Sequence, residues 1–124
     1  MGKFDGENFS ITYATLGGKV VIYCPNDKKG LKQQNQSKET ILNINKEIVT
    51  LTYGAGQFGS NKNYLFVASP SSLYCYDFLE NKTIFNKEID DGVFSMAFGA
   101  YSNFQKPLII VGGNCSLQGF DISG

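Results

Sequence analysis

Hydrophobic and polar residues alternate along most of the chain in short runs, and a period of two residues is typical of β-strands. The runs Tyr64–Ser69 and Leu73–Phe78 are joined by a short Pro/Ser turn and predict a hairpin. The runs Leu108–Val111 and Ser116–Ile122 flank Gly112-Gly113-Asn114 and predict a second hairpin, whose glycines would supply the positive φ that tight turns need. No run shows a 3.6-residue stripe, and β-branched and aromatic residues dominate, so the chain is predicted to be all-β.

The hairpins recur at a fixed spacing. A further apolar run precedes each of them, Ile48–Ala55 and Val93–Ala100, and these two runs correspond at 45 positions. The clearest pairs between the hairpins lie 44 positions apart: Leu65 with Ile109, Leu73 with Leu117, and Asp77 with Asp121.

The N-terminal part repeats the same design. Strands are expected at Phe9–Thr15 and Lys19–Tyr23, around a Leu-Gly-Gly turn. After an insertion at Asp27–Glu39, the run Thr40–Ile48 resembles Thr83–Ile89. If the strands of one unit are called a to d, the order along the chain is b, c, d; a, b, c, d; a, b, c.

Four short strands in a repeat of about 40–45 residues are typical of a β-propeller blade. The sequence therefore predicts a partial β-propeller of about two and a half four-stranded antiparallel blades, with a period near 44 residues. We expect one domain over residues 1–124, with blade pieces at roughly 9–47, 48–91 and 92–124. Small residues at the ends of the b strands (Ala14, Ala68 and Gly112) suit crowded packing near a central axis. Because propellers normally close with about four to eight blades, we expect the chain to be part of a longer protein.

Charge and hydropathy remove several classes of partner. Eleven basic and eleven acidic side chains give a formal net charge of +0, which provides no electrostatic surface for nucleic acid. The only cationic cluster, Lys28, Lys29 and Lys32, is expected to be a solvated loop. No apolar run approaches the roughly 20 residues of a membrane-spanning helix, and the N-terminus lacks the apolar core of a signal peptide. We expect a cytoplasmic protein that does not insert into a membrane.

Cysteine and histidine usage argues against catalysis and metal binding. Cys24, Cys75 and Cys115 are widely spaced, and the chain has no histidine. A zinc site lacks its ligands, and the commonest general base is missing. Asn-x-Ser/Thr occurs at four positions, but without a signal peptide it is read as a consequence of Asn and Ser richness. We therefore expect no catalytic residue, no cofactor and no metal.

Three motifs suggest a site and are better explained by turns. Gly54–Gly59 spells G-x-G-x-x-G, but a turn and a strand follow it instead of the helix that a dinucleotide site needs. Phe4–Asn8 and Ile89–Phe94 lack the alternating oxygen ligands of a calcium loop, and Asp-Gly turn chemistry explains both. Asp90 and Asp91 are sequence neighbours whose carboxylates should point apart. Most strand-borne aromatic residues are expected between blades: Tyr53, Tyr64, Phe66, Tyr74, Tyr76, Phe94 and Phe98.

The end of the chain resembles the N-terminal β-propeller of the Bardet-Biedl syndrome protein 2 family, which carries an Ile-Gly-Gly-Asn-Cys-x-Leu-Gln-Gly-Phe run. The matching residues here are Gly112, Gly113, Asn114, Cys115, Leu117, Gln118, Gly119 and Phe120. Weaker similarity extends over nearly the whole chain: Gly18, Lys19, Val20, Ile22 and Pro25 match a Thr-Gly-Lys-Val-x-Ile-x-x-Pro segment, and Tyr76, Asp77, Asp91 and Gly92 match two others. The chain departs from the family in its shorter, Lys/Gln-rich loop at Asp27–Glu39 and in Cys75.

This resemblance implies a subunit of the BBSome, the coat that carries membrane-protein cargo into and out of cilia. It implies other BBSome subunits as direct partners, cargo as an indirect one, and a location at the cilium, the basal body and, peripherally, the ciliary membrane. The family has no catalytic residues to transfer.

Two alternatives remain. A quinoprotein-like dehydrogenase propeller also places x-Tyr-Asp on its third strand, but it uses Trp between blades and binds quinone with calcium, and this chain has neither Trp nor a calcium pattern. A generic propeller scaffold with another partner is the second. Because open blade edges invite pairing, we also expect copies of the chain to associate edge to edge.

Overall fold

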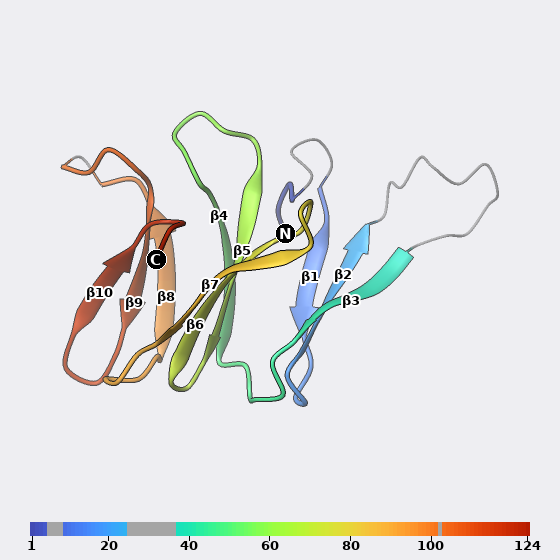
Figure 1. The fold of residues 1–124 in the computed structure, drawn as a ribbon, viewed down its shortest axis with the longest axis horizontal. Coiled ribbons are helices and arrows are strands. Elements are labelled where there is room, and N and C mark those ends of the chain that lie inside the picture. The colour runs from blue at the N-terminus through green and yellow to red at the C-terminus, as the bar shows by residue number, and fades with distance from the viewer. Residues whose placement is uncertain (5–8, 25–36, 102) are drawn as a thin grey trace.

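The computed structural model describes residues 1–4, 9–24, 37–101 and 103–124, and all regular structure within these ranges is β. Figure 1 shows the strands as three antiparallel sheets standing side by side in chain order. The first sheet has the order β1-β2-β3, the middle sheet β4-β5-β6-β7, and the third sheet β10-β9-β8. The strands are β1 (Ile11–Ala14), β2 (Lys19–Cys24), β3 (Ser37–Asn43), β4 (Thr50–Ala55), β5 (Asn63–Ser69), β6 (Ser72–Asp77), β7 (Lys82–Glu88), β8 (Ser95–Gly99), β9 (Leu108–Gly112) and β10 (Leu117–Phe120).

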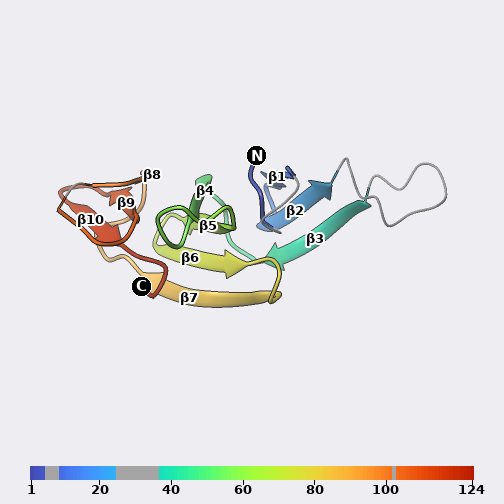
Figure 2. The ribbon, with the colours of Figure 1, turned by 90° about the horizontal axis from the view of Figure 1, so that it is seen from above.

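The predicted order b, c, d; a, b, c, d; a, b, c is confirmed, and the chain is an all-β partial propeller whose sheets do not close into a ring. Viewed from above in Figure 2, the first and third sheets flank the middle one.

The middle sheet is covered on both sides, and its alternating pattern divides its residues between two cores. Leu65 and Val67 of β5 face the first sheet, and Phe66 and Ala68 face the third. Cross-strand pairs keep this division, because Leu65 lies opposite Tyr76 and Phe66 lies opposite Cys75. Fully burying one such large side chain contributes about 1.5–3 kcal/mol to the free energy of unfolding.

We call the face of a sheet that looks toward the preceding sheet its leading face, and the opposite face its trailing face. The first core joins the trailing face of the first sheet to the leading face of the middle sheet. Its buried residues are Phe4, Val20, Ile22, Leu65, Val67 and Tyr76. The second core repeats this arrangement between the middle and third sheets, with Phe66, Ala68, Leu73, Cys75, Ile89, Val93, Ile109, Val111 and Phe120.

The N-terminal segment belongs to the first core, which the sequence pattern did not predict. Gly2 pairs with Ser10 through two backbone hydrogen bonds of 3.0 and 2.9 Å. Lys3 exchanges hydrogen bonds with Asn63 at the start of β5. Phe4 is 1% exposed and packs edge to face against Tyr53, so this short segment ties the first sheet to the middle sheet.

One strand was placed wrongly by the sequence pattern. The run Thr40–Ile48 was expected to be a strand, whereas β3 begins at Ser37 and ends at Asn43. Asn45 has a φ of 53°, and its amide donates to Asn43 Oδ1, so the backbone turns out of the sheet there. Part of the expected insertion, Ser37–Glu39, is therefore strand, and the rest of it lies outside the described residues, as does the lysine cluster.

Candidate functional site

The family-like run forms the hairpin of the third sheet. Gly112 ends β9, Gly113 to Ser116 make the turn, and Leu117–Phe120 are β10. The run does not gather its side chains into one pocket. Phe120 is 8% exposed in the second core, whereas Leu117 is 78% exposed on the opposite face of the sheet.

Asp91 holds this turn from outside the hairpin. It lies in the connector between β7 and β8, and its carboxylate accepts hydrogen bonds from the amides of Cys115 at 2.9 Å and Ser116 at 2.8 Å. The Ser116 hydroxyl donates to the same oxygen at 2.7 Å. Asn114 completes the contact, since its amide and its side chain both donate to the Asp91 carbonyl. We call this set of bonds the Asp91 clamp.

The glycines of the turn are needed for space and not for backbone conformation. The expectation of positive φ was wrong for Gly112 and Gly113, because the described glycines with positive φ are Gly18, Gly59, Gly92 and Gly124. A Cβ on Gly113 would lie 2.9 Å from the Gly92 carbonyl oxygen and closer still to the Asp91 carboxylate. A side chain there would therefore displace the Asp91 clamp.

The connector that carries Asp91 also binds the hairpin turn of the middle sheet. The Ile89 amide donates to the Ser71 carbonyl at 2.8 Å, and the Val93 amide donates to the Pro70 carbonyl at 3.0 Å. Ile89 and Val93 are buried in the second core. The five-residue connector Ile89–Val93 thus binds both the hairpin turn of the middle sheet and the hairpin turn of the third sheet.

Hydrogen bonds lower the pKa of the Asp91 carboxyl, with the Cys115 amide as the largest cause and Ser116 next. The Asp91 side chain is accordingly an acceptor of hydrogen bonds. Among the described residues, the hydrogen bonds to this turn come from Asp91, and none of them involves the Asp90 side chain.

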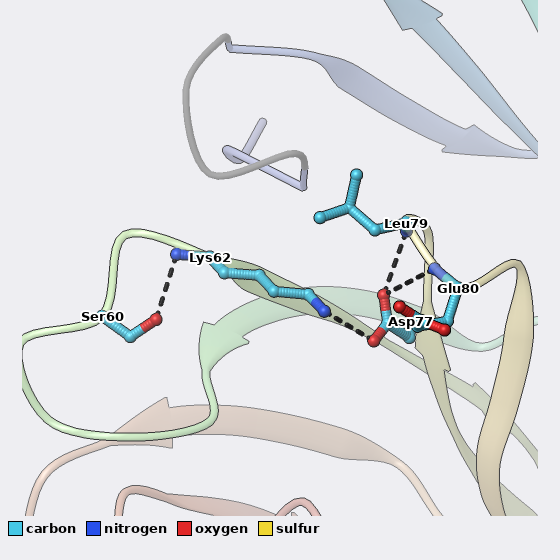
Figure 3. Close-up of polar contacts among 5 residues, drawn as sticks. All are labelled: Ser60, Lys62, Asp77, Leu79 and Glu80. Carbon is cyan, nitrogen blue, oxygen red and sulfur yellow. Dashed lines mark hydrogen bonds and ion pairs between the residues drawn. The ribbon is translucent and has the colours of Figure 1, made fainter.

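A second polar arrangement ties the loop between β4 and β5 to the end of β6 (Figure 3). Lys62 Nζ lies 2.7 Å from Asp77 Oδ2, and the Asp77 side chain is 4% exposed. The other carboxylate oxygen, Oδ1, accepts the amides of Leu79 at 3.0 Å and Glu80 at 3.3 Å. The Asp77 carboxylate therefore both closes the turn after β6 and anchors the preceding loop.

The pKa values of this pair move apart because each partner favours the charged form of the other. Burial alone would raise the pKa of Asp77, but the hydrogen bonds from Lys62, Glu80 and Leu79 outweigh it and lower the pKa. Burial would likewise lower the pKa of Lys62, but its hydrogen bond to Asp77 and the negative charge there raise it.

The third sheet repeats this ion pair. Lys106 Nζ lies 3.4 Å from Asp121 Oδ2, and the Ser123 amide donates to Asp121 Oδ1 at 2.8 Å. The sequence pattern had matched Asp77 with Asp121 but had missed the lysines. Lys62 and Lys106 also lie 44 positions apart, so the repeat itself carried the signal that would have found them.

The motifs that could suggest chemistry have structural roles where the structure describes them. The ring of Phe98 packs directly on Gly54, and Tyr64 and Ile122 pack on Gly56. A Cβ at either glycine would overlap these side chains, so the glycine-rich loop permits close packing. Burial raises the pKa of the Cys75 thiol to about 12, and Cys115 is exposed. Among the described residues, no group of three or more His, Cys, Asp or Glu could hold a metal ion.

The aromatic residues behave mostly as expected. Phe66 and Tyr76 are buried, and Tyr64, Tyr74 and Phe98 pack against the two cores. Tyr53 and Phe94 are exceptions, at 45% and 63% exposure. None of the described segments forms a helix long and apolar enough to span a bilayer.

Comparison with known proteins places the chain in a family. The model for the family described as ciliary BBSome complex subunit 2, N-terminal, matches residues 1–99. BBSome complex member BBS2 of Danio rerio is 38% identical over 131 aligned positions that cover 100% of this chain, and the human BBS2 is 30% identical over the same share. BBSome complex member bbs-2 of Caenorhabditis elegans is 35% identical over 72% of this chain.

The chain spans only a small part of the length of those relatives. The aligned region covers 18% of the fish and human proteins and 12% of the nematode protein. The family model ends before the run Gly112–Phe120, which only the alignments to whole-chain relatives cover. The chain belongs to the family of ciliary BBSome complex subunit 2, in its N-terminal region.

Proposed function

We propose that this chain is a non-catalytic, protein-interaction part of a BBSome subunit. The observation that carries the proposal is the similarity over the whole chain to proteins named as BBSome complex members. The full protein would bind other BBSome subunits and would contribute to the transport of membrane-protein cargo in cilia. Its place would be the cytoplasm, the basal body and the ciliary membrane as a peripheral component.

Within that function, residues 1–124 serve as a rigid propeller segment, with blade pieces at roughly 9–47, 48–91 and 92–124. The Asp91 clamp supports this role, because it binds the turn of one sheet to the connector from the preceding sheet. The run Gly112–Phe120 is proposed to be a structural turn and strand and not a catalytic or ligand-binding site. Its glycines leave room for Asp91 and Gly92.

Affinity purification of the full-length protein from ciliated cells tests the proposal. We expect other BBSome subunits to be recovered with the tagged full-length protein, and the tagged protein to be seen at the cilium and the basal body. A bait that lacks residues 1–124 serves as the control for the contribution of this segment, and it should recover less of the complex. Recovery of none of the other subunits with the full-length bait would overturn the proposal.

A further inference from the structure

The N-terminal segment, residues 1–4, pairs with the first sheet at a position that recurs in the other two sheets. In each sheet one glycine pairs with a residue near the start of the neighbouring strand: Gly2 with Ser10, Gly54 with Tyr64, and Gly99 with Leu108. These partners each lie four positions before the small residue near the end of their strand: Ala14, Ala68 and Gly112. The three pairs are therefore equivalent, and Gly2 takes the place that the ends of β4 and β8 take in their sheets.

An aromatic ring from the following sheet covers the first two of these glycines. A Cβ on Gly54 would overlap the ring of Phe98, and a Cβ on Gly2 would lie 3.1 Å from the ring of Tyr53. Tyr53 directly precedes Gly54, and Phe98 directly precedes Gly99, so each ring packs on the glycine of the preceding sheet. The first and middle sheets thus meet through the same ring-on-glycine contact as the middle and third sheets.

Lys3 and Phe4 join the segment to the middle sheet. The Lys3 amide donates to Asn63 Oδ1 at 2.8 Å, and the Lys3 carbonyl accepts the Asn63 amide at 2.9 Å. Phe4 is 1% exposed and fills the first core beside Tyr53. In Figure 1 the N-terminus accordingly lies between β1 and the middle sheet. The segment therefore contacts both sheets at once.

The pairing of this segment is much shorter than that of its equivalents. β4 has six residues and β8 has five, whereas the described residues of the segment make one isolated bridge to the first sheet. Elements with few backbone hydrogen bonds open locally at a lower free energy than the sheets around them. The contact between the first and middle sheets therefore depends on an element that can detach while the middle sheet stays folded.

We propose that residues 1–4 act as a strap, which replaces the end of the first strand of the first sheet and holds that sheet on the middle sheet. Gly2 provides the space for the Tyr53 ring, and Phe4 holds the strap in the first core. Release of the strap loosens the first sheet, whereas the second core, whose described residues do not include the strap, stays closed. The strap thus controls the mobility of one outer sheet independently of the other. This inference goes beyond membership of the family and does not depend on it.

Hydrogen exchange of the full-length protein, followed by mass spectrometry, tests the proposal. We expect Phe4→Ala to accelerate amide exchange in β1 and β2 by at least about tenfold and to leave β9 and β10 within about twofold of the wild-type rate. Leu16→Ala is the matched control and should change neither sheet, because Leu16 is 97% exposed in the turn between β1 and β2. Equal acceleration in the first and third sheets, or no acceleration in the first, would overturn the proposal.

A second pair of substitutions tests the ring-on-glycine contact. Gly2→Val should also accelerate exchange in β1 and β2, because the added side chain takes the space of the Tyr53 ring. Tyr53→Ala removes that ring, so Gly2→Val should change the exchange rate by no more than about twofold in the Tyr53→Ala background. Circular dichroism checks that the sheets are formed, and Gly2→Ala replaces Gly2→Val if they are not. An undiminished effect of the Gly2 substitution without the ring, or no effect with it, would contradict the strap.

Discussion

Asp77 places a charged group where almost no water reaches it. Its two oxygens are used completely, one by Lys62 and one by the Leu79 and Glu80 amides. A buried carboxylate with partners of this kind stabilises the fold mainly because removing any partner leaves the others unpaired. Asp121 repeats the geometry with a side chain that is 25% exposed, so water can replace much of what it binds.

Replacing Asp77 by Asn should therefore cost more stability than the same change at Asp121. We expect Asp77→Asn to lower the free energy of unfolding by about 1–3 kcal/mol, since charged hydrogen bonds to Lys62 are lost in a buried setting. Asp121→Asn, the matched control, should cost about 0.2–1 kcal/mol, as is usual for an exposed pair. Urea unfolding followed by circular dichroism measures both, and equal losses would show that burial of Asp77 does not matter.

Connectors and turns decide how the sheets are fastened together. The connector at residues 89–93 binds the hairpin turns of two sheets, and its position depends on the missing side chain at Gly113. Gly17 is a glycine of the turn between β1 and β2 in the first sheet, and nothing lies within 4 Å of a Cβ placed there.

Gly113→Ala and Gly17→Ala form a matched pair of turn variants. Gly113→Ala should lower the free energy of unfolding by about 1–3 kcal/mol, because the added methyl group overlaps Asp91 and Gly92. Gly17→Ala should change it by no more than about 0.5 kcal/mol. The urea midpoints of the two variants decide between two explanations. If lack of space is the cause, only Gly113→Ala lowers the midpoint. If the turns need glycine for its backbone φ, both substitutions lower it.

The elements themselves could be read from the sequence, because alternation and the 44-residue repeat are local or periodic signals. The ends of β3 could not, since Asn45 adopts a positive φ that depends on neighbouring turns. The Asp91 clamp was also hidden, because it joins residues 23 to 25 positions apart and has no repeat equivalent among the described residues. The burial of Phe4 gave no sequence signal either, because Phe4 is a single aromatic residue in a polar segment. The neighbouring Lys3 binds Asn63, which lies 60 positions further along the chain.

At the scale of the whole molecule, stability rests on one sheet buried between two others and on a small set of carboxylates that fasten the loops. Asp77, Asp91 and Asp121 all have pKa values below the ordinary value in the folded protein. Hydrogen bonds from the Ser123 side chain and amide are the main causes at Asp121.

These shifts predict a loss of stability in acid. A carboxyl with a lowered folded pKa stabilises the protein above its unfolded pKa, near 3.9, and this contribution disappears as the pH falls through the lower folded pKa. We expect the urea midpoint to be nearly constant from about pH 7 to pH 5 and to fall progressively below about pH 4. A chain with Asn at all three positions should be less stable at pH 7 and should show a flatter profile, and an equally steep acid loss in that variant would place the cause elsewhere.

The N-terminal segment has a consequence for the order of events during synthesis. Lys3 is made early, but its partner Asn63 is translated 60 positions later. At about 5–20 residues per second, that interval is about 3–12 s. Phe4 remains without its burial site for this time, because Leu65, Val67 and Tyr76 are made later still. Lys3 and Phe4 therefore reach their native contacts only after the strands of the middle sheet have been translated.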